Sequence, residues 1–182
     1  MKTISDHVLD IVQNSVRAEA TLIEIIVDED KKNDFYALKI NDNGCGMSRE
    51  VSQNAANPFF TSRNTRKVGL GLSLLKQNAE AAGGSFQLWS EPRKGTKVQA
   101  VFQLSHYDRP PTGDVWDTWF LTLLSNPAIR LVYKHQTGKG SFTVDSAEVL
   151  EMLEGVRLQQ KEVKDGVIEW IKNNLEEIEA SK

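Results

Sequence analysis

The segment Asn41-Asp42-Asn43-Gly44-Cys45-Gly46 constrains the fold more than any other, because two glycines and three Asx residues oppose both helix and strand. It therefore predicts a loop. Residues 35–40, directly before it, place three large apolar side chains on one face, which is typical of a half-buried strand. Residues 21–27 are β-branched and aliphatic and predict a partner strand, joined to the first by a polar turn at 28–34. The loop thus lies at the end of a predicted pair of strands.

Apolar spacing predicts the other elements. Apolar residues at helical intervals indicate an opening helix over 4–18, with Ser5 or Asp6 as its cap. The glycine pair at 83–84 indicates the end of a second long helix over 69–82. The remaining predictions are helices at 48–56, 115–124 and 146–153, a mobile loop at 57–68, hairpin strands at 85–90 with 96–104 and at 129–135 with 141–144, and an amphipathic last helix with apolar residues from Val163 to Ile178.

Composition excludes several classes of protein. The 182 residues carry a formal net charge of −3, which does not indicate a general nucleic-acid or membrane-surface binder. No apolar run approaches the ~20 residues needed to span a bilayer, and the first residues lack the apolar stretch of a signal peptide. Cys45 is the only cysteine, which excludes disulfides within the chain and cysteine-based zinc sites. These features predict a cytoplasmic protein, and we expect Cys45 to be a small buried side chain.

Asp10 and Asn14 are the first candidate functional residues. Four residues apart on the opening helix, they lie on one face, away from the apolar stripe. A carboxylate can orient or deprotonate a water, and an amide oxygen can ligate a hard cation. The same pair is also typical of a solvated polar face, so these two residues alone do not identify a site.

Asp42 in the glycine-containing loop is the second candidate. A carboxylate fixed after a strand can accept a hydrogen bond from an exocyclic amine, and glycines let the backbone pass close to a flat ring. Asx-Gly is also a common turn signal, so a plain tight turn is the alternative.

The segment Gly69-Leu70-Gly71-Leu72 at a predicted helix start is the third candidate. Free backbone N–H groups and the helix dipole make such a position a natural phosphate seat. The sequence has neither a Walker P-loop nor a Rossmann GxGxxG motif. The preceding loop carries hydroxyls and cations that can close over phosphates, and an exposed charged loop is the alternative. These loop residues are Thr61, Ser62, Arg63, Asn64, Thr65, Arg66 and Lys67.

In this order and spacing, the segments resemble the GHKL ATPases, the class of histidine kinases, DNA gyrase, MutL and heat-shock chaperones. Any one motif is weak, but all of them occur in order over residues 4–104. Asp10–Ala18 resembles the N box, Asp42–Met47 the first glycine box, Asn57–Thr61 the phenylalanine box of sensor kinases, Gly69–Ser73 the second glycine box, and Gly95-Thr96 the hairpin motif that closes the adenine pocket.

The resemblance implies ATP and Mg²⁺ as cofactors and suggests a role for each residue. Asn14 would ligate Mg²⁺ between the phosphates, and Asp10 stands where hydrolytic members carry a glutamate base. Asp42 would bind the adenine amino group, helped by Thr96 and an ordered water. The other implied nucleotide-binding residues are Gly44, Gly46 and Met47 beside the adenine, Phe59, Phe60 and Thr61 at the lid, Arg63, Arg66 and Lys67 at the β- or γ-phosphate, and Gly69, Leu70, Gly71 and Leu72 along the phosphates.

Two departures from the family pattern affect the expected activity. Asp10 is one methylene shorter than glutamate, and a misplacement near an ångström can slow a reaction ~100-fold, so we expect slow hydrolysis. Lys67 and Val68 stand where many kinases have Gly-Thr before the second glycine box.

The implied fold is a Bergerat α/β sandwich, with a mixed, mainly antiparallel sheet, helices on one face, and ATP between helices and lid. We expect an ATP-binding domain at 1–106, a linker at 107–113, and a small α+β C-terminal region at 114–182. Trp116 and Trp119 in that region are expected to be core anchors. The last helix is expected to pack on its own domain, and a homodimer or partner surface is the alternative.

The three histidines do not suit a self-contained sensor kinase. His7 lies in the N-box helix and lacks the acidic residue and downstream proline of the family's usual acceptor motif, while His106 and His135 follow the domain. Three hypotheses therefore stay open: a small kinase that phosphorylates a protein partner, a weak ATPase whose lid acts on a partner, and a nucleotide-sensing module without turnover. Asp10 favours the first two.

Overall fold

The computed structural model describes residues 1–57 and 71–181. Its scaffold is a six-stranded sheet in the order β3-β4-β2-β1-β5-β6. Neighbouring strands are antiparallel, except that β1 and β5 run parallel. The strands are β1 (Leu22–Asp30), β2 (Phe35–Asp42), β3 (Ser85–Glu91), β4 (Gly95–Gln103), β5 (Arg130–Thr137) and β6 (Gly140–Asp145).

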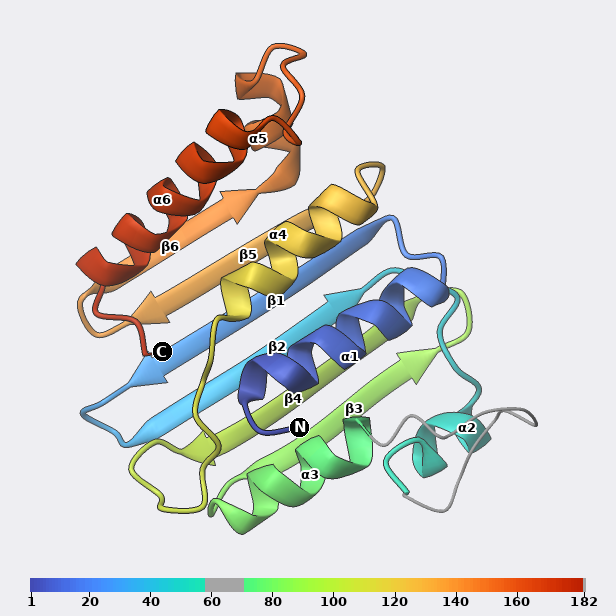
Figure 1. The fold of residues 1–182 in the computed structure, drawn as a ribbon. Helices are drawn as coiled ribbons and strands as arrows, with labels where there is room; N and C mark the ends of the chain where they lie inside the picture. The colour runs from blue at the N-terminus through green and yellow to red at the C-terminus, as the bar shows by residue number, and fades with distance from the viewer. Residues whose placement is uncertain (58–70, 182) are drawn as a thin grey trace.

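Helices cover one face of this sheet (Figure 1). Along β1, buried and half-buried residues alternate, so one side of the strand faces the helices and carries Ile23, Ile25 and Val27 into the core. The mixed, mainly antiparallel sheet with helices on one face confirms the predicted fold. The helices are α1 (Ile4–Arg17), α2 (Arg49–Asn54), α3 (Gly71–Ala81), α4 (Val115–Ser125), α5 (Ser146–Met152) and α6 (Lys161–Glu177).

The start of α1 differs from the prediction in one detail. Thr3, not Ser5, caps the helix: its hydroxyl accepts from the backbone N–H of Asp6, and the Asp6 carboxylate accepts from that of Thr3. Ser5 instead joins α1 to the segment before α4. Its backbone N–H donates to the carbonyl of Thr112 at 2.9 Å, and its hydroxyl donates to that of Asp114 at 3.0 Å. Spacing along the sequence could not reveal such a long-range partner.

The C-terminal region extends the same sheet, because β5 pairs with β1 from Leu22 to Asp28. The predicted division at 107–113 stays a prediction, although strands on both sides of it belong to one sheet. Trp119 is fully buried, and its indole N–H donates to the carbonyl of Leu131 at 2.8 Å. Trp116 is also buried, which confirms that both tryptophans are core anchors.

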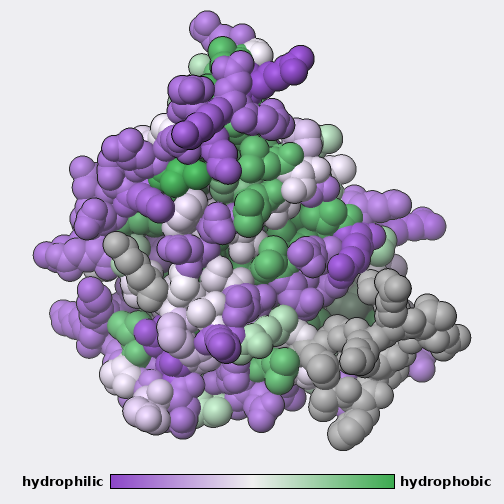
Figure 2. All heavy atoms as spheres, viewed as in Figure 1, coloured by the Kyte–Doolittle hydropathy of each residue, from purple (hydrophilic) through white to green (hydrophobic). Residues whose placement is uncertain are grey.

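The last helix packs on its own sheet, as favoured above. Ile171 and Leu175 of α6 are buried, and the Trp170 ring lies edge-on to Phe142 of β6 at 5.2 Å between centroids. Figure 2 shows the helical face as spheres: hydrophilic residues cover its outer parts, and hydrophobic residues gather near the middle, over α4. Within the described residues, no helix combines the length and apolar character needed to cross a membrane.

Candidate functional site

Asp42, the last residue of β2, is fixed by three hydrogen-bond donors. Its Oδ1 accepts from the backbone N–H of Gly44 at 2.9 Å and from that of Thr96 on β4 at 3.2 Å. Its Oδ2 accepts from the hydroxyl of Ser15 on α1 at 2.7 Å. The carboxylate therefore holds together the end of β2, the glycine-containing loop, β4 and α1.

These bonds leave Asp42 able to recognise one further donor. An ionised carboxylate offers about four acceptor positions, and the three bonds above use all but one of them. Because Asp42 is only half-buried, the free position on Oδ2 can accept from a ligand. An exocyclic amine such as that of adenine is a donor of this kind, so the residues present fit the predicted contact.

Ser90 connects the loop to the Thr96 side of the site. Its hydroxyl accepts from the backbone N–H of Met47 at 2.9 Å, donates to the carbonyl of Gly95 at 3.0 Å, and lies 2.9 Å from the Thr96 hydroxyl. Because the Ser90 hydroxyl donates to the carbonyl of Gly95, it accepts the hydrogen bond of the Thr96 hydroxyl. The Thr96 oxygen can then still accept a hydrogen bond from a ligand. Ser15 and Ser90 could not be predicted as site residues, because a single serine in a helix or strand carries no spacing signal.

Gly46 is required by the neighbouring hairpin. Its φ of +64° is a conformation that L side chains rarely adopt. A Cβ there would lie 1.9 Å from the carbonyl oxygen of Glu91 at the β3–β4 turn. The fold itself therefore requires a glycine at position 46. The predicted close passage of an adenine ring is not needed to explain it.

Gly46→Ala is expected to lower the free energy of unfolding by at least about 2 kcal/mol, because the alanine combines a left-handed backbone with an overlap against a carbonyl. Urea unfolding followed by circular dichroism would measure the change. Gly138→Ala is the matched control, since a Cβ there meets no heavy atom within 4 Å, and its effect should stay within about 0.5 kcal/mol. Equal stability of the two variants would contradict the steric argument.

Asp10 lies directly against the start of α3. A Cβ on Gly71 would fall 1.9 Å from Asp10 Oδ2, so only glycine allows this approach. Asp10 Oδ2 also accepts from the side-chain amide of Asn14 at 3.4 Å, and Asn14 Oδ1 accepts from Arg17 at 3.1 Å. The structure thus places Gly71 and Asn14 against Asp10, and Arg17 against Asn14.

The donor set suits a magnesium ion only with help from a ligand. Asp10 and Asn14 offer hard oxygens, but no group of three or more His, Cys, Asp or Glu residues within the described parts of the chain could hold a metal alone. Mg²⁺ is commonly bound through one or two protein oxygens together with substrate phosphates. Arg17 is exposed and can move away from the Asn14 oxygen, so the residues fit a shared site of this kind.

Several predicted residues lie outside the described part of the chain, in 58–70. The side chain of Leu72, by contrast, is described, and it packs against the core. Cys45 is exposed, so the expectation that it is buried was wrong: Gly44 takes the buried place against Ala18, and the Cys45 side chain is left in solvent. The predicted residues outside the described part are Phe59, Phe60, Thr61, Arg63, Arg66, Lys67, Gly69 and Leu70.

The fold and this arrangement are those of a nucleotide-binding α/β sandwich. Residues 2–106 match the family described as histidine kinase-, DNA gyrase B-, and HSP90-like ATPase, and the chain belongs to this family. Membership confirms the predicted GHKL resemblance and supports ATP as the ligand of the class.

Similar proteins agree with this assignment. A protein of Shewanella frigidimarina named as a sensor protein is 36% identical over 102 residues, which are 55% of this chain and 16% of the relative. The cell-division control histidine kinase PdhS of Brucella ovis is 30% identical over 125 residues, or 61% of this chain and 11% of the relative. The chain therefore spans only a small part of the length of these relatives.

A solved structure shows the same fold. The crystal structure of the N-terminal domain of a DNA repair protein superposes with a TM-score of 0.50 at 20% sequence identity, covering 79% of this chain and 52% of that one. At this identity the likeness concerns the fold alone.

Proposed function

We propose that this chain is a Mg²⁺-dependent ATP-binding protein that acts as a small kinase on a protein partner. The observation that carries the proposal is that α1 contacts both ends of the site. Ser15 holds Asp42 through its hydroxyl, while Asp10, less than two turns earlier on the same helix, lies against Gly71. One rigid helix therefore sets the spacing between the proposed adenine contact and the proposed phosphate contact.

At the adenine end, Asp42 acts as the acceptor for the amino group. Its orientation is fixed before any ligand binds, because three donors hold the carboxylate. Thr96, tied to Ser90, contributes a second acceptor beside it. Such preorganised groups bind a ligand without an ordering cost of their own.

At the phosphate end, α3 begins beside Asp10 and Asn14. Helix N-termini attract phosphate groups through free N–H donors and the helix dipole. Asn14 Oδ1 would share Mg²⁺ with the phosphates, and bound Mg²⁺ would supply charge neutralisation there. Asp10 can then accept a proton from an attacking hydroxyl or water.

A phosphoacceptor outside this chain follows from the burial of its histidines. His7 is fully buried, with Nε2 2.9 Å from the Asn78 amide, and burial lowers its pKa below the ordinary histidine value. His135 is 1% exposed. His106 is partly exposed, but it is the last residue of the family match and follows β4. We therefore expect the acceptor on a partner protein.

Incubation of the purified chain with γ-labelled ATP, Mg²⁺ and cell extract tests the proposal. The expected result is label on another protein, lost when Asp42→Asn replaces the wild type and when EDTA removes the metal. Label appearing only as free phosphate would instead support a weak ATPase. Neither product, despite ATP binding, would leave a nucleotide-sensing module.

A further inference from the structure

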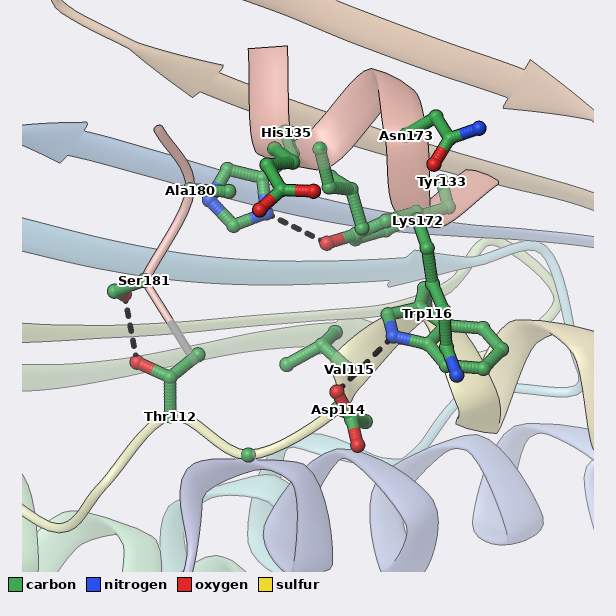
Figure 3. Close-up of a pocket in the computed structure, with 13 residues that line it drawn as sticks. Thr112, Asp114, Val115, Trp116, Tyr133, His135, Lys172, Asn173, Ala180 and Ser181 are labelled. Carbon is green, nitrogen blue, oxygen red and sulfur yellow. Dashed lines mark hydrogen bonds between the residues drawn. The ribbon is translucent and has the colours of Figure 1, made fainter. Parts of the chain in front are cut away.

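A cavity of about 430 Å³ lies apart from the proposed nucleotide site, because none of its lining residues belongs to the predicted nucleotide-binding set. It is bounded by the first turn of α4, by β5, by the last turns of α6 and by the C-terminal tail (Figure 3). Pockets of roughly 300–1,000 Å³ are typical of small-molecule sites. The chemistry of its walls therefore indicates what it can hold.

A chain of short hydrogen bonds forms the floor. The phenol of Tyr133 lies 2.6 Å from Nδ1 of His135, and Nε2 of His135 lies 2.5 Å from Oε1 of Glu29. All three side chains are 1% exposed. Burial raises the pKa of Glu29, but hydrogen bonds from His135 and Ser181 outweigh it, so the pKa lies below the ordinary glutamate value.

The ionised Glu29 can only accept hydrogen bonds, so Nε2 of His135 donates to it. Ser181 likewise donates its hydroxyl to Glu29 at 2.8 Å, so it accepts from the hydroxyl of Thr112, 2.8 Å away. The protons of Ser181 and Thr112 are thereby used, so these two hydroxyls can offer a ligand only acceptors.

The rim of the cavity also offers hydrogen-bond acceptors. Asp114 and Glu176 are exposed carboxylates among the lining residues. The ring of Trp116 forms one wall, with its N–H bonded to Asp114 at 3.1 Å. The ammonium of Lys172 lies 5.2 Å from the centre of that ring, so this wall already binds a cation of the protein itself (Figure 3). Acceptors, carboxylates and an aromatic face together recognise an organic ammonium group.

We infer that the cavity between α4, β5 and α6 binds a small organic cation, a primary alkylammonium, whose nitrogen replaces that of Lys172 beside Trp116. Its carbon chain packs on Val115 and Leu175, which are buried lining residues. Lys172 is exposed on its helix, so it can turn outward when the ligand enters. This inference does not depend on the proposed kinase activity, and its test contains no ATP.

The test uses butylammonium, butanol and butyrate, three probes of matched length that differ in charge. Each is titrated into the full chain while the indole N–H signal of Trp116 is followed by NMR, with the signal assigned by its loss in Trp116→Phe. Butylammonium is expected to shift the Trp116 signal saturably, with a Kd in the millimolar range because the ligand is so small. Butanol and butyrate are expected to leave the signal unchanged. A shift with butyrate alone, or none with butylammonium, would overturn the inference.

Rim variants sharpen the result, and Asp114→Asn keeps a side-chain oxygen that can accept from the Trp116 N–H. Asp114→Asn and Glu176→Gln should each weaken butylammonium binding about fivefold, the upper range for an exposed ion pair. Lys172→Met should strengthen butylammonium binding, because it removes the competing ammonium. If the cavity were an anion site, the same variant would weaken binding of its ligand. Glu169→Gln, exposed on the same helix and outside the lining, is the control and should change nothing. Unchanged affinity in all three rim variants would contradict the assignment.

Discussion

Asp42→Asn is expected to weaken binding of Mg-ATP about 100-fold, in line with the loss of a hydrogen bond to a charged group. An asparagine has a single acceptor oxygen in place of two. If that oxygen keeps the backbone N–H groups of Gly44 and Thr96, the amide nitrogen faces Ser15 and the ligand. Ser15 can turn its hydroxyl to accept from this nitrogen, but the adenine amine then meets a donor in place of an acceptor.

Isothermal titration of Mg-ATP into wild type and variant would measure the loss. Asp165→Asn removes the same charge from an exposed position on α6 and should bind ATP like the wild type. Circular dichroism must show that Asp42→Asn stays folded, because Asp42 also ties α1 to two strands. A folded Asp42→Asn protein with wild-type affinity would remove Asp42 from the nucleotide site.

Asp10→Asn is expected to lower phosphate turnover about 100- to 1,000-fold while ATP affinity changes by less than about threefold. General-base catalysis typically contributes a factor of this size, and an amide cannot take a proton at neutral pH. Asn14 loses an acceptor at 3.4 Å, a long and weak contact, so this proposed metal ligand should keep its place. Phosphate release and labelling of the partner, each measured with saturating ATP, would report the change.

The variant Asp10→Glu separates chemistry from position. It restores the side-chain length that hydrolytic members of the family use, but the added methylene must fit against Gly71, which Asp10 already contacts closely. Turnover equal to the wild type in Asp10→Asn would show that Asp10 is not a base. In that case the carboxylate would only help to seat α3.

Local patterns in the sequence predicted most of the fold because they depend on neighbours along the chain. The alternation over 35–40 marked β2, and helical spacing marked α1. The four-residue spacing of Asp10 and Asn14 placed them on one face without any structure. The order of the motifs then indicated the family, which the match over 2–106 confirms.

Long-range contacts could not be read in this way. Glu29 and His135 are 106 positions apart. Glu29 was predicted in the polar turn at 28–34, although β1 continues to Asp30, and His135 ends a predicted strand. The parallel pairing of β1 with β5 joins Leu22 to Arg130, far apart in the sequence. Ser15 and Ser90 orient the site residues from elements whose own sequence needs no serine there. Such features depend on tertiary packing, which no window of the sequence contains.

The pairing of β1 with β5 has a practical consequence for anyone who isolates the ATPase portion. A fragment cut after residue 106 would strip the outer edge of β1 and leave unpaired N–H and C=O groups from Leu22 to Asp28. Bare edges of this kind invite strand addition from other molecules and hence aggregation. Residues 2–106 match the family, but the strand that covers the edge of β1 lies outside them. The matched residues alone therefore lack their protection against self-association.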